Sequence, residues 1–150
     1  MEAVVVSQAG AEEAEPIAEM YAWLFAPPGR RPPGWTDDAG VAAIRRVIAS
    51  ETSVILIARR GNQRLGFCSA YADIESVRFG RRVWVEDLAV HPDHRSEGTG
   101  RLLLDAAKEW ARARGAARLA LDSGEARRDA HRFYEREQPT YRSFCFGWEL

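Results

Sequence analysis

The chain has 150 residues, about the length of one ordinary domain, and a formal net charge of −1. Hydrophobic residues make up 46% and charged residues 29%, as in soluble globular proteins. This near-neutral balance does not indicate nucleic-acid or anionic-membrane binding. No stretch approaches the ~20 apolar residues of a membrane span, and the N-terminus does not resemble a signal peptide. We therefore expect a single domain over residues 1–150, located in the cytoplasm.

The two cysteines, Cys68 and Cys145, lie far apart in the sequence. Neither belongs to a CxxC pair or to a Cys/His cluster with metal-ligand spacing. We expect two buried or half-buried free thiols and no metal site.

The first part of the chain predicts a strand, two helices and a second strand. Residues 4–6 are a short β-branched run, and residues 11–25 carry apolar side chains at helical spacing. Residues 26–34 contain four prolines and two glycines, which exclude regular structure. Asp37 or Asp38 is expected to cap the second helix, and the apolar run 53–58 predicts a central strand.

The second part alternates strands with helices. Gly61-Asn62 indicates a hairpin turn, and Gly115 indicates the end of a helix. The predicted elements are strands at 65–74, 83–90, 118–121 and 141–148 and helices at 99–114 and 125–137. This order predicts an α/β domain in which an antiparallel first part meets parallel strands around the 99–114 crossover.

The turn at residues 95–100 is the most informative segment. It places Arg95, Gly98 and Gly100 between a predicted strand and a predicted helix. Helix N-termini present unpaired N–H groups and attract phosphate, glycines let the backbone approach an anion, and arginine adds charge-assisted hydrogen bonds. The spacing matches neither the P-loop nor the dinucleotide fingerprint. On its glycines alone, the turn fits a plain strand-to-helix connection equally well.

Several motifs together resemble a known family. They are DLAVHP at 87–92, Arg95-x-x-Gly98-x-Gly100, the leucines at 102–104, and AHRFYE at 130–135. The segment resembles the acetyl-CoA-binding motif of the GCN5-related N-acetyltransferases (GNAT). The motifs cover about residues 83–134, and the order of elements agrees over nearly the whole chain. The resemblance implies a single α/β domain with a mixed central sheet of about six to seven strands flanked by about four helices.

The resemblance also implies a binding mode for acetyl-CoA as cosubstrate, without a metal. Backbone groups of Leu88, Ala89 and Val90 would pair with the pantetheine arm. The thioester would lie where this strand splays from the 118–121 strand, and an N–H near Leu88 would stabilise the developing oxyanion. Backbone N–H groups along the turn would hold the pyrophosphate, those of Arg95, Ser96, Glu97, Gly98, Thr99, Gly100 and Arg101.

Acyl transfer to an amine needs a proton acceptor and a donor for the departing thiolate. Tyr134 matches the family's thiolate-protonating tyrosine. The alternative is that Tyr134 is an ordinary half-buried aromatic residue of a helix. Glu86 is the expected base, as in similar members that acetylate polyamines, with Asp87 or a water relay left open. Neighbouring strand residues point to opposite faces, so Glu86 and Asp87 are not expected to line the site equally. One of them could instead pair with Arg81 or Arg82.

Three positions depart from the family pattern. Arg127 stands where many members carry an asparagine that bonds the pantetheine, and Ser123 is the expected substitute. Gln138-Pro139 replaces a common glycine and aromatic after the tyrosine, leaving the exit from that helix open. Ser96 replaces a frequent glycine, which is tolerable if the residue keeps a negative φ.

Other polar groups carry plainer interpretations. The three histidines, His91, His94 and His131, are expected to be solvent-facing or capping residues. The arginines of the 125–137 helix, Arg127 among them, are expected to form a solvated face, with contact to the coenzyme's 3′-phosphate as the alternative.

The acceptor site is expected near the first two helices and their connection. Aromatic residues there would shape a pocket for an amine or belong to the core: Tyr21, Trp23, Phe25 and Trp35. Carboxylates that could attract a cationic acceptor are Asp37, Asp38, Asp73 and Glu75.

The sequence therefore predicts an acetyl-CoA-dependent N-acetyltransferase that acts on a primary amine of a small molecule by direct attack on the thioester. The alternatives are acetylation of a peptide N-terminus or lysine, and a non-catalytic acyl-CoA-binding regulatory domain. The expected partner is a small-molecule amine, with no nucleic acid and no membrane. A homodimer is left open.

Overall fold

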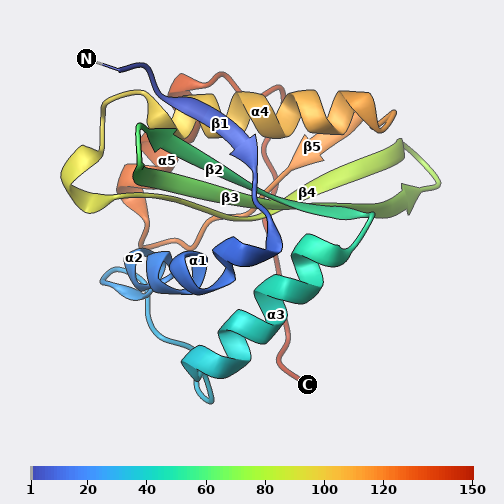
Figure 1. Cartoon of the computed structure of the whole chain (residues 1–150). Coiled ribbons are helices and arrows are strands. Elements are labelled where there is room, and N and C mark those ends of the chain that lie inside the picture. The colour runs from blue at the N-terminus through green and yellow to red at the C-terminus, as the bar shows by residue number, and fades with distance from the viewer. Residues whose placement is uncertain (1) are drawn as a thin grey trace.

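One sheet of five strands forms the centre of the computed structural model, which describes residues 2–150 apart from the side chain of Asp73. The strands lie in the sheet in chain order (Figure 1). They are β1 (Val5–Gln8), β2 (Ser53–Arg60), β3 (Gln63–Ser76), β4 (Gly80–Val90) and β5 (Arg118–Ala120). The first four pair antiparallel, and β4 pairs parallel with β5.

Helices cover both faces of this sheet (Figure 1). One face carries α1 (Ala14–Met20), preceded by a 3₁₀ turn, η1 (Ala11–Glu13), with α2 (Ala22–Phe25) and α3 (Asp37–Ala49). The opposite face carries α4 (Thr99–Ala113). A second 3₁₀ turn, η2 (Pro92–His94), precedes α4, and α5 (Arg128–Arg136) follows β5. Among the described residues, no helix combines the length and the apolar character needed to cross a membrane.

Strand β2 shows why the sheet lies at the centre of the molecule. Its side chains alternate between two cores: Val54 and Leu56 pack on the α4 side, whereas Ile55 and Ile57 pack on the side of α1 and α3. A strand buried on both faces reads as a nearly continuous apolar run, as residues 53–58 do. The two cores also distinguish the two faces of β4: one face lies toward α4, and the other lies toward α1 and α3.

The predicted mixed α/β fold is confirmed, including the antiparallel part and the parallel pair around α4. The described sheet has five strands, and residues 141–150, which include the predicted strand 141–148, pair with none of them. The alternation of apolar residues in this segment predicts which face a strand would bury, but it does not determine which strand would pair with it. The helical region 11–25 is interrupted at Tyr21, and the last helix begins at Arg128 rather than at residue 125.

The cap of α3 also differs from the prediction. Thr36 is the N-cap, and its hydroxyl accepts a 3.1 Å hydrogen bond from the Ala39 N–H. Asp37 and Asp38 lie in the first turn, where their charges favour the positive end of the helix dipole.

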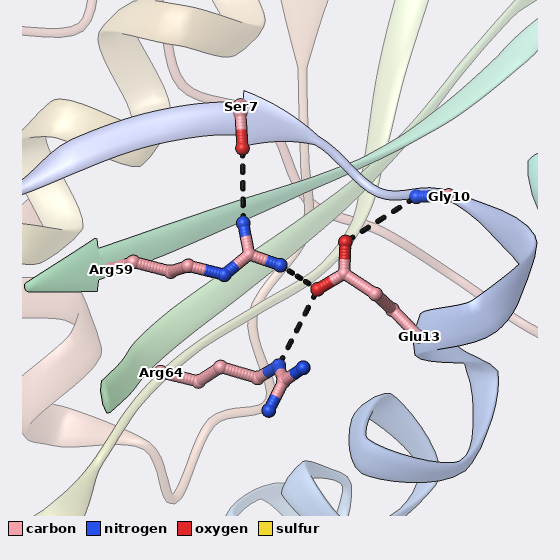
Figure 2. A network of polar contacts seen from close by, with 5 residues as sticks. All are labelled: Ser7, Gly10, Glu13, Arg59 and Arg64. Atoms are coloured by element: carbon pink, nitrogen blue, oxygen red, sulfur yellow. Dashed lines mark hydrogen bonds and ion pairs between the residues drawn. The ribbon is translucent and has the colours of Figure 1, made fainter. Parts of the chain in front are cut away.

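A buried carboxylate ties the start of α1 to the sheet (Figure 2). Glu13 is 7% exposed and pairs with both Arg59 of β2 and Arg64 of β3. Its other oxygen accepts from the Gly10 N–H at 3.4 Å, and Arg59 donates to the Ser7 hydroxyl at 3.1 Å. The network therefore fixes the start of α1 against three strands.

Candidate active site

A β-bulge in β4 sets the direction of the acidic side chains. Asp87 lies opposite Ser69 and Val85 lies opposite Ala70, so Glu86 is the extra residue of the bulge. Val85 and Leu88 both pack on the α4 side. Glu86 and Asp87, between them, therefore both lie on the side of α1 and α3. The expectation that these neighbours point to opposite faces is wrong, because the bulge interrupts the strand alternation.

The second half of β4 has an open edge. The pairing with β5 reaches only as far as Trp84 and Ala120, and no other described strand lies on that side. On the other side, the His91 N–H donates to the Leu65 carbonyl at 2.8 Å. Antiparallel pairs alternate, so Ala89 faces β3 as His91 does, whereas Leu88 and Val90 turn their backbone groups to the open edge. The Val90 carbonyl accepts from Arg95 Nε at 3.3 Å.

The turn after β4 leads into an uncapped helix N-terminus. Gly98 is the N-cap of α4 with φ of +90°, and it has no side chain to satisfy the first N–H groups of the helix. A Cβ added to Gly98 would meet nothing within 4 Å, so the space in front of the turn is open. Open space, free N–H groups and the positive end of a 15-residue helix together favour an anion.

Ser96 differs from the expectation. Its φ is +64°, in the left-handed region, whereas a negative φ was the condition for a tolerable serine. The turn needs this conformation at two nearby positions, 96 and 98, and only the second is a glycine. Serine there costs on the order of 1 kcal/mol relative to glycine.

The side chains of the turn mainly hold its shape. Glu97 lies 2.9 Å from Nδ1 of His94, whose Nε2 lies 3.2 Å from Gln63 Nε2. Arg101 lies 3.8 Å from Glu137 and 3.9 Å from Asp105. The backbone, rather than these side chains, is therefore the part of the turn most available to a ligand.

The histidines have structural partners. His91 is the N-cap of η2, where its Nδ1 accepts from the Asp93 N–H at 3.1 Å, and its ring packs edge-on against Trp23. His131 lies 2.9 Å from the Gly124 carbonyl.

Helix α5 brings a tyrosine toward the open edge from the α4 side. Phe133 packs on Gly100, where an added Cβ would lie 3.3 Å from the phenyl ring. Burial, followed by the nearby Cys68, raises the pKa of the neighbouring Tyr134 to about 12. Cys68 belongs to the α4-side core and lies opposite Leu88 in the register. Tyr134 and the two carboxyl groups of β4 thus lie on opposite faces of the sheet.

Asp87 is held by its neighbours. Its Oδ2 accepts a 2.7 Å hydrogen bond from the Tyr21 hydroxyl, and its N–H donates to the Ser69 hydroxyl at 3.2 Å. Burial raises the pKa of Asp87, whereas the bonds from Tyr21 and Ser69 oppose that rise. Burial, followed by the charge of Asp87, raises the pKa of Tyr21 well above its ordinary value. Tyr21 is therefore a neutral donor to this carboxyl group.

Glu86 is exposed and lines a hollow. Its Oε2 accepts from Trp84 Nε1 at 3.0 Å. Partial burial, followed by the neighbouring charge of Asp87, raises its pKa. The hollow has a volume of about 320 Å³ and is lined by Tyr71, Ile74, Trp84 and Glu86. Neither carboxyl group is bonded to an arginine of the β4 start, since Arg81 pairs with Glu75 instead.

Arg127 reaches across to the other side of the molecule. Its guanidinium donates to the Leu24 carbonyl of α2 at 3.1 Å, and its charge partly opposes the rise in the pKa of both Asp87 and Tyr134. The expectation that Arg127 belongs to a solvated helix face is therefore wrong. The hydroxyl of Ser123 is buried and has no hydrogen-bond partner among the described residues.

The aromatic residues predicted for the acceptor pocket pack largely on one another. Trp35 lies 5.7 Å from Tyr21 and 4.9 Å from Phe25, measured between ring centroids. Tyr21 also lies 4.8 Å from Phe67 in the core. The sequence reasoning missed Trp84 and Tyr71, although Trp84 stands two residues before Glu86, a spacing that places both on one face of a strand.

Of the other predicted carboxylates, Asp37, Asp38 and Glu75 do not line this hollow. Asp37 accepts from Trp35 Nε1 at 3.3 Å, and Glu75 pairs with Arg81. The side chain of Asp73 lies outside the described part of the structure. A larger hollow of about 830 Å³ is lined by residues including Thr52, Arg81 and Trp110, and Glu75 is the predicted carboxylate that lines it.

Comparisons with known proteins found similarity to acetyltransferases. The family model described as Acetyltransferase (GNAT) family matches residues 15–138. An uncharacterized N-acetyltransferase of Bacillus subtilis, YhdJ, is 46% identical over 59 residues, which are 39% of this chain and 42% of that protein. Streptothricin acetyltransferase of Streptomyces lavendulae is 34% identical over 71 residues, 47% of this chain and 38% of that protein. The chain thus spans less than half the length of these two relatives.

A solved structure shares the fold over the whole chain. It is the aminoglycoside N-acetyltransferase AAC(6′)-Iy in complex with CoA, with a TM-score of 0.86. The alignment covers 100% of this chain and 96% of that chain at 18% sequence identity, so the likeness concerns the fold.

Proposed function

Since the chain belongs to the acetyltransferase (GNAT) family, we propose that it transfers an acetyl group from acetyl-CoA to a primary amine of a small cationic molecule. The observation that carries the proposal is the junction of β4 and α4. An open strand edge at Leu88 and Val90 leads directly into an uncapped helix N-terminus at Gly98.

The residues present fit the coenzyme. The N–H groups of Thr99, Gly100 and Arg101 are the first of α4 and would hold the pyrophosphate. The open edge at Leu88 and Val90 would pair with the amide groups of the pantetheine arm as an added strand. Ala89 turns its backbone to β3 and is left out of this pairing. The buried, unpartnered hydroxyl of Ser123 is a further group available to the arm.

The coenzyme supplies an acetyl group activated as a thioester. The N–H of Leu88 points out of the sheet where the thioester carbonyl would lie, and it would stabilise the negative charge that develops on that oxygen. A donor fixed in a strand needs no reorganisation during the reaction.

Glu86 and Tyr134 divide the proton transfers between the two faces of the sheet. Glu86 is accessible and lines the hollow, so we assign it as the base that takes a proton from the incoming amine. Asp87 is committed to Tyr21 and Ser69 and acts behind Glu86 as a fixed neighbouring carboxyl group. The high pKa of Tyr134 keeps its hydroxyl protonated, so it can donate to the departing thiolate from the α4 side.

The hollow favours a small acceptor. Its volume of about 320 Å³ lies at the lower end of ligand pockets, and its lining combines two aromatic rings with a carboxylate. Aromatic faces and negative charge attract an ammonium group. The relatives named for aminoglycoside and streptothricin acetylation act on amine-bearing small molecules of this kind.

A thiol-release assay tests the proposal. Acetyl-CoA is offered with a panel of aminoglycosides, polyamines and amine-bearing peptides, and the acetylated product is identified by mass spectrometry. We expect acceptor-dependent CoA release with at least one small polycationic amine. Turnover on peptides alone would contradict the proposed acceptor class, and acetyl-CoA binding without turnover on any acceptor would favour a regulatory acyl-CoA-binding domain.

A further inference from the structure

The hydrogen bond from Arg127 to the Leu24 carbonyl joins two parts of the chain that lie on opposite faces of the sheet. Leu24 belongs to α2, on the face of α1 and α3, whereas Arg127 stands directly before α5, which carries Tyr134 on the α4 side. The charge of Arg127 opposes the rise in the pKa of both Asp87 and Tyr134. The guanidinium therefore lies beside the open edge of β4, where the two faces meet.

The sequence explains why α2 needs a donor from outside. In a continuing helix, the Leu24 carbonyl would accept from the N–H of residue 27 or 28, and both positions are proline, which has no N–H. The Arg127 guanidinium supplies the missing donor at 3.1 Å. A charged donor makes a stronger hydrogen bond than a neutral one. The end of α2 is therefore held by a residue 103 positions away.

The loop after α2 folds tightly around the same contact. The Gly29 N–H donates to the Ala26 carbonyl at 2.8 Å, which closes a turn over residues 26–29. A Cβ added to Gly29 would overlap the Leu24 carbonyl oxygen and lie 2.6 Å from Arg127 Nη2. Glycine is the residue that lets the loop approach this closely. The Arg127 contact thus fixes the start of the proline-rich loop as well as α2.

The end of α2 also packs on the residues beside the proposed base. Phe25 and Trp35 flank the loop, and both rings pack on Tyr21. Tyr21 in turn donates to Asp87, which lies next to Glu86 on the same face of the sheet. A shift of α2 would therefore move groups on the acceptor side of Glu86.

We propose that Arg127 is a positioning residue for the acceptor: by bonding the Leu24 carbonyl, it holds α2 and the proline-rich loop at residues 26–34 in the arrangement that receives the amine. The inference rests on the proposed acetyl transfer. It assigns Arg127 to the acceptor side, whereas the family resemblance would place a coenzyme ligand at this position. The two roles can be separated because Gly29 touches the contact only from the side of α2.

Steady-state kinetics of two variants, with an acceptor found by thiol release, test the role. Arg127→Met removes the donor, and Gly29→Ala forces the loop away from it while keeping the arginine. Both should raise the KM for the amine by at least about tenfold, as expected for loss of a charge-assisted hydrogen bond. The Kd for acetyl-CoA should stay within about twofold of the wild-type value. Two controls should keep the wild-type KM: Arg128→Met removes an exposed arginine one position along, and Gly124→Ala adds a Cβ that meets nothing within 4 Å.

Hydrogen exchange of the free protein gives a readout that does not depend on turnover. The amides of Phe25 and Ala26, at the end of α2, should lose protection in Arg127→Met and Gly29→Ala but not in the two controls. Unaltered protection, or an unaltered acceptor KM in either variant, would overturn the proposal. A loss of acetyl-CoA affinity in Arg127→Met would overturn it too, because Arg127 would then be a coenzyme ligand.

The failure of this role is distinguishable from the failure of the proposed function. If the wild-type chain acetylates no amine, the proposed function fails and the role of Arg127 fails with it. If the wild-type chain turns over and the two variants match it, only the role of Arg127 fails.

Discussion

The bulge in β4 places the carboxyl group of Asp87 on the same face of the sheet as that of Glu86. Without the bulge, Glu86 and Asp87 would lie on opposite faces, and only one of them could approach the amine. With it, partial burial and then the charge of the neighbouring Asp87 raise the pKa of Glu86. A base with a raised pKa accepts a proton more readily, which suits general-base catalysis near neutral pH.

The pH profile of the reaction reports this base. Glu86 must be deprotonated to act, so kcat/KM should fall as the pH drops through its raised pKa. The acid limb should therefore lie above the ordinary glutamate value of ~4.3. In Glu86→Gln this limb should disappear and the plateau should fall by about 10² or more. A control, Glu75→Gln, removes a carboxylate outside the hollow and should keep the wild-type profile, and an unchanged acid limb in Glu86→Gln would exclude this base.

Tyr134→Phe tests the other proton. Removing the hydroxyl should lower kcat by about 10²-fold or more, because the thiolate then leaves without its acid. The affinity for acetyl-CoA, measured by calorimetry, should remain near the wild-type value. If the kcat of Tyr134→Phe equals that of the wild type with the same acceptor, the assigned role of Tyr134 is excluded.

The hydrogen bond from Tyr21 to Asp87 stabilises the fold at a single point. Tyr21→Phe leaves a buried carboxyl group without its 2.7 Å donor and should lower the free energy of unfolding by about 1–3 kcal/mol. Urea titration measures this change. Tyr141→Phe is the matched control, because Tyr141 is exposed and its hydroxyl has no such acceptor among the described residues. Equal stability of the two variants would contradict the account of Asp87.

At the scale of elements, the network around Glu13 sets where α1 begins (Figure 2). Because α1 leads directly to Tyr21, this network also positions the helix that faces Asp87. Glu13→Gln leaves Arg59 and Arg64 without a counter-charge beside a largely buried site and should destabilise the protein by about 1–3 kcal/mol. Chemical denaturation checks the value.

The pair of Glu15 with Arg45 is a control for Glu13. It spans 3.1 Å, but its side chains are 69% and 53% exposed. Water screens such pairs, so Glu15→Gln should change stability by less than about 1 kcal/mol. If Glu15→Gln costs as much as Glu13→Gln, burial is not the source of the Glu13 contribution.

For the whole molecule, the sequence predicts the elements that are fixed by local pattern and misses those fixed by register. The apolar run at 53–58 and the helix around Leu103 each carry their own signal and form as predicted. The bulge at Glu86 depends on how two strands align, which neither strand specifies alone. The hollow also needs Tyr71 of β3, which lies opposite Trp84 only because of the strand register.

Long-range contacts explain the other differences. In the sequence, Arg127 looks like one of several surface arginines. In the fold, α2 lies close to it and provides the Leu24 carbonyl, 103 positions away, as its hydrogen-bond acceptor. Residues 141–148 have a strand pattern but no strand partner among the described residues. In both cases the sequence shows the chemistry of the side chains, but the tertiary fold decides which residues they contact.

The central claim concerns the junction of β4 and α4, and calorimetric titration of acetyl-CoA into the full chain tests it most directly. We predict one saturable site that Gly98→Val abolishes, because a side chain there fills the open space in front of the α4 N-terminus. Gly115→Val is the matched control: its φ of +73° imposes a similar backbone strain at the other end of α4, also in open space. It should bind acetyl-CoA as the wild type does. Failure of the wild-type chain to bind acetyl-CoA, or binding that Gly98→Val leaves unchanged in a folded protein, would contradict the account.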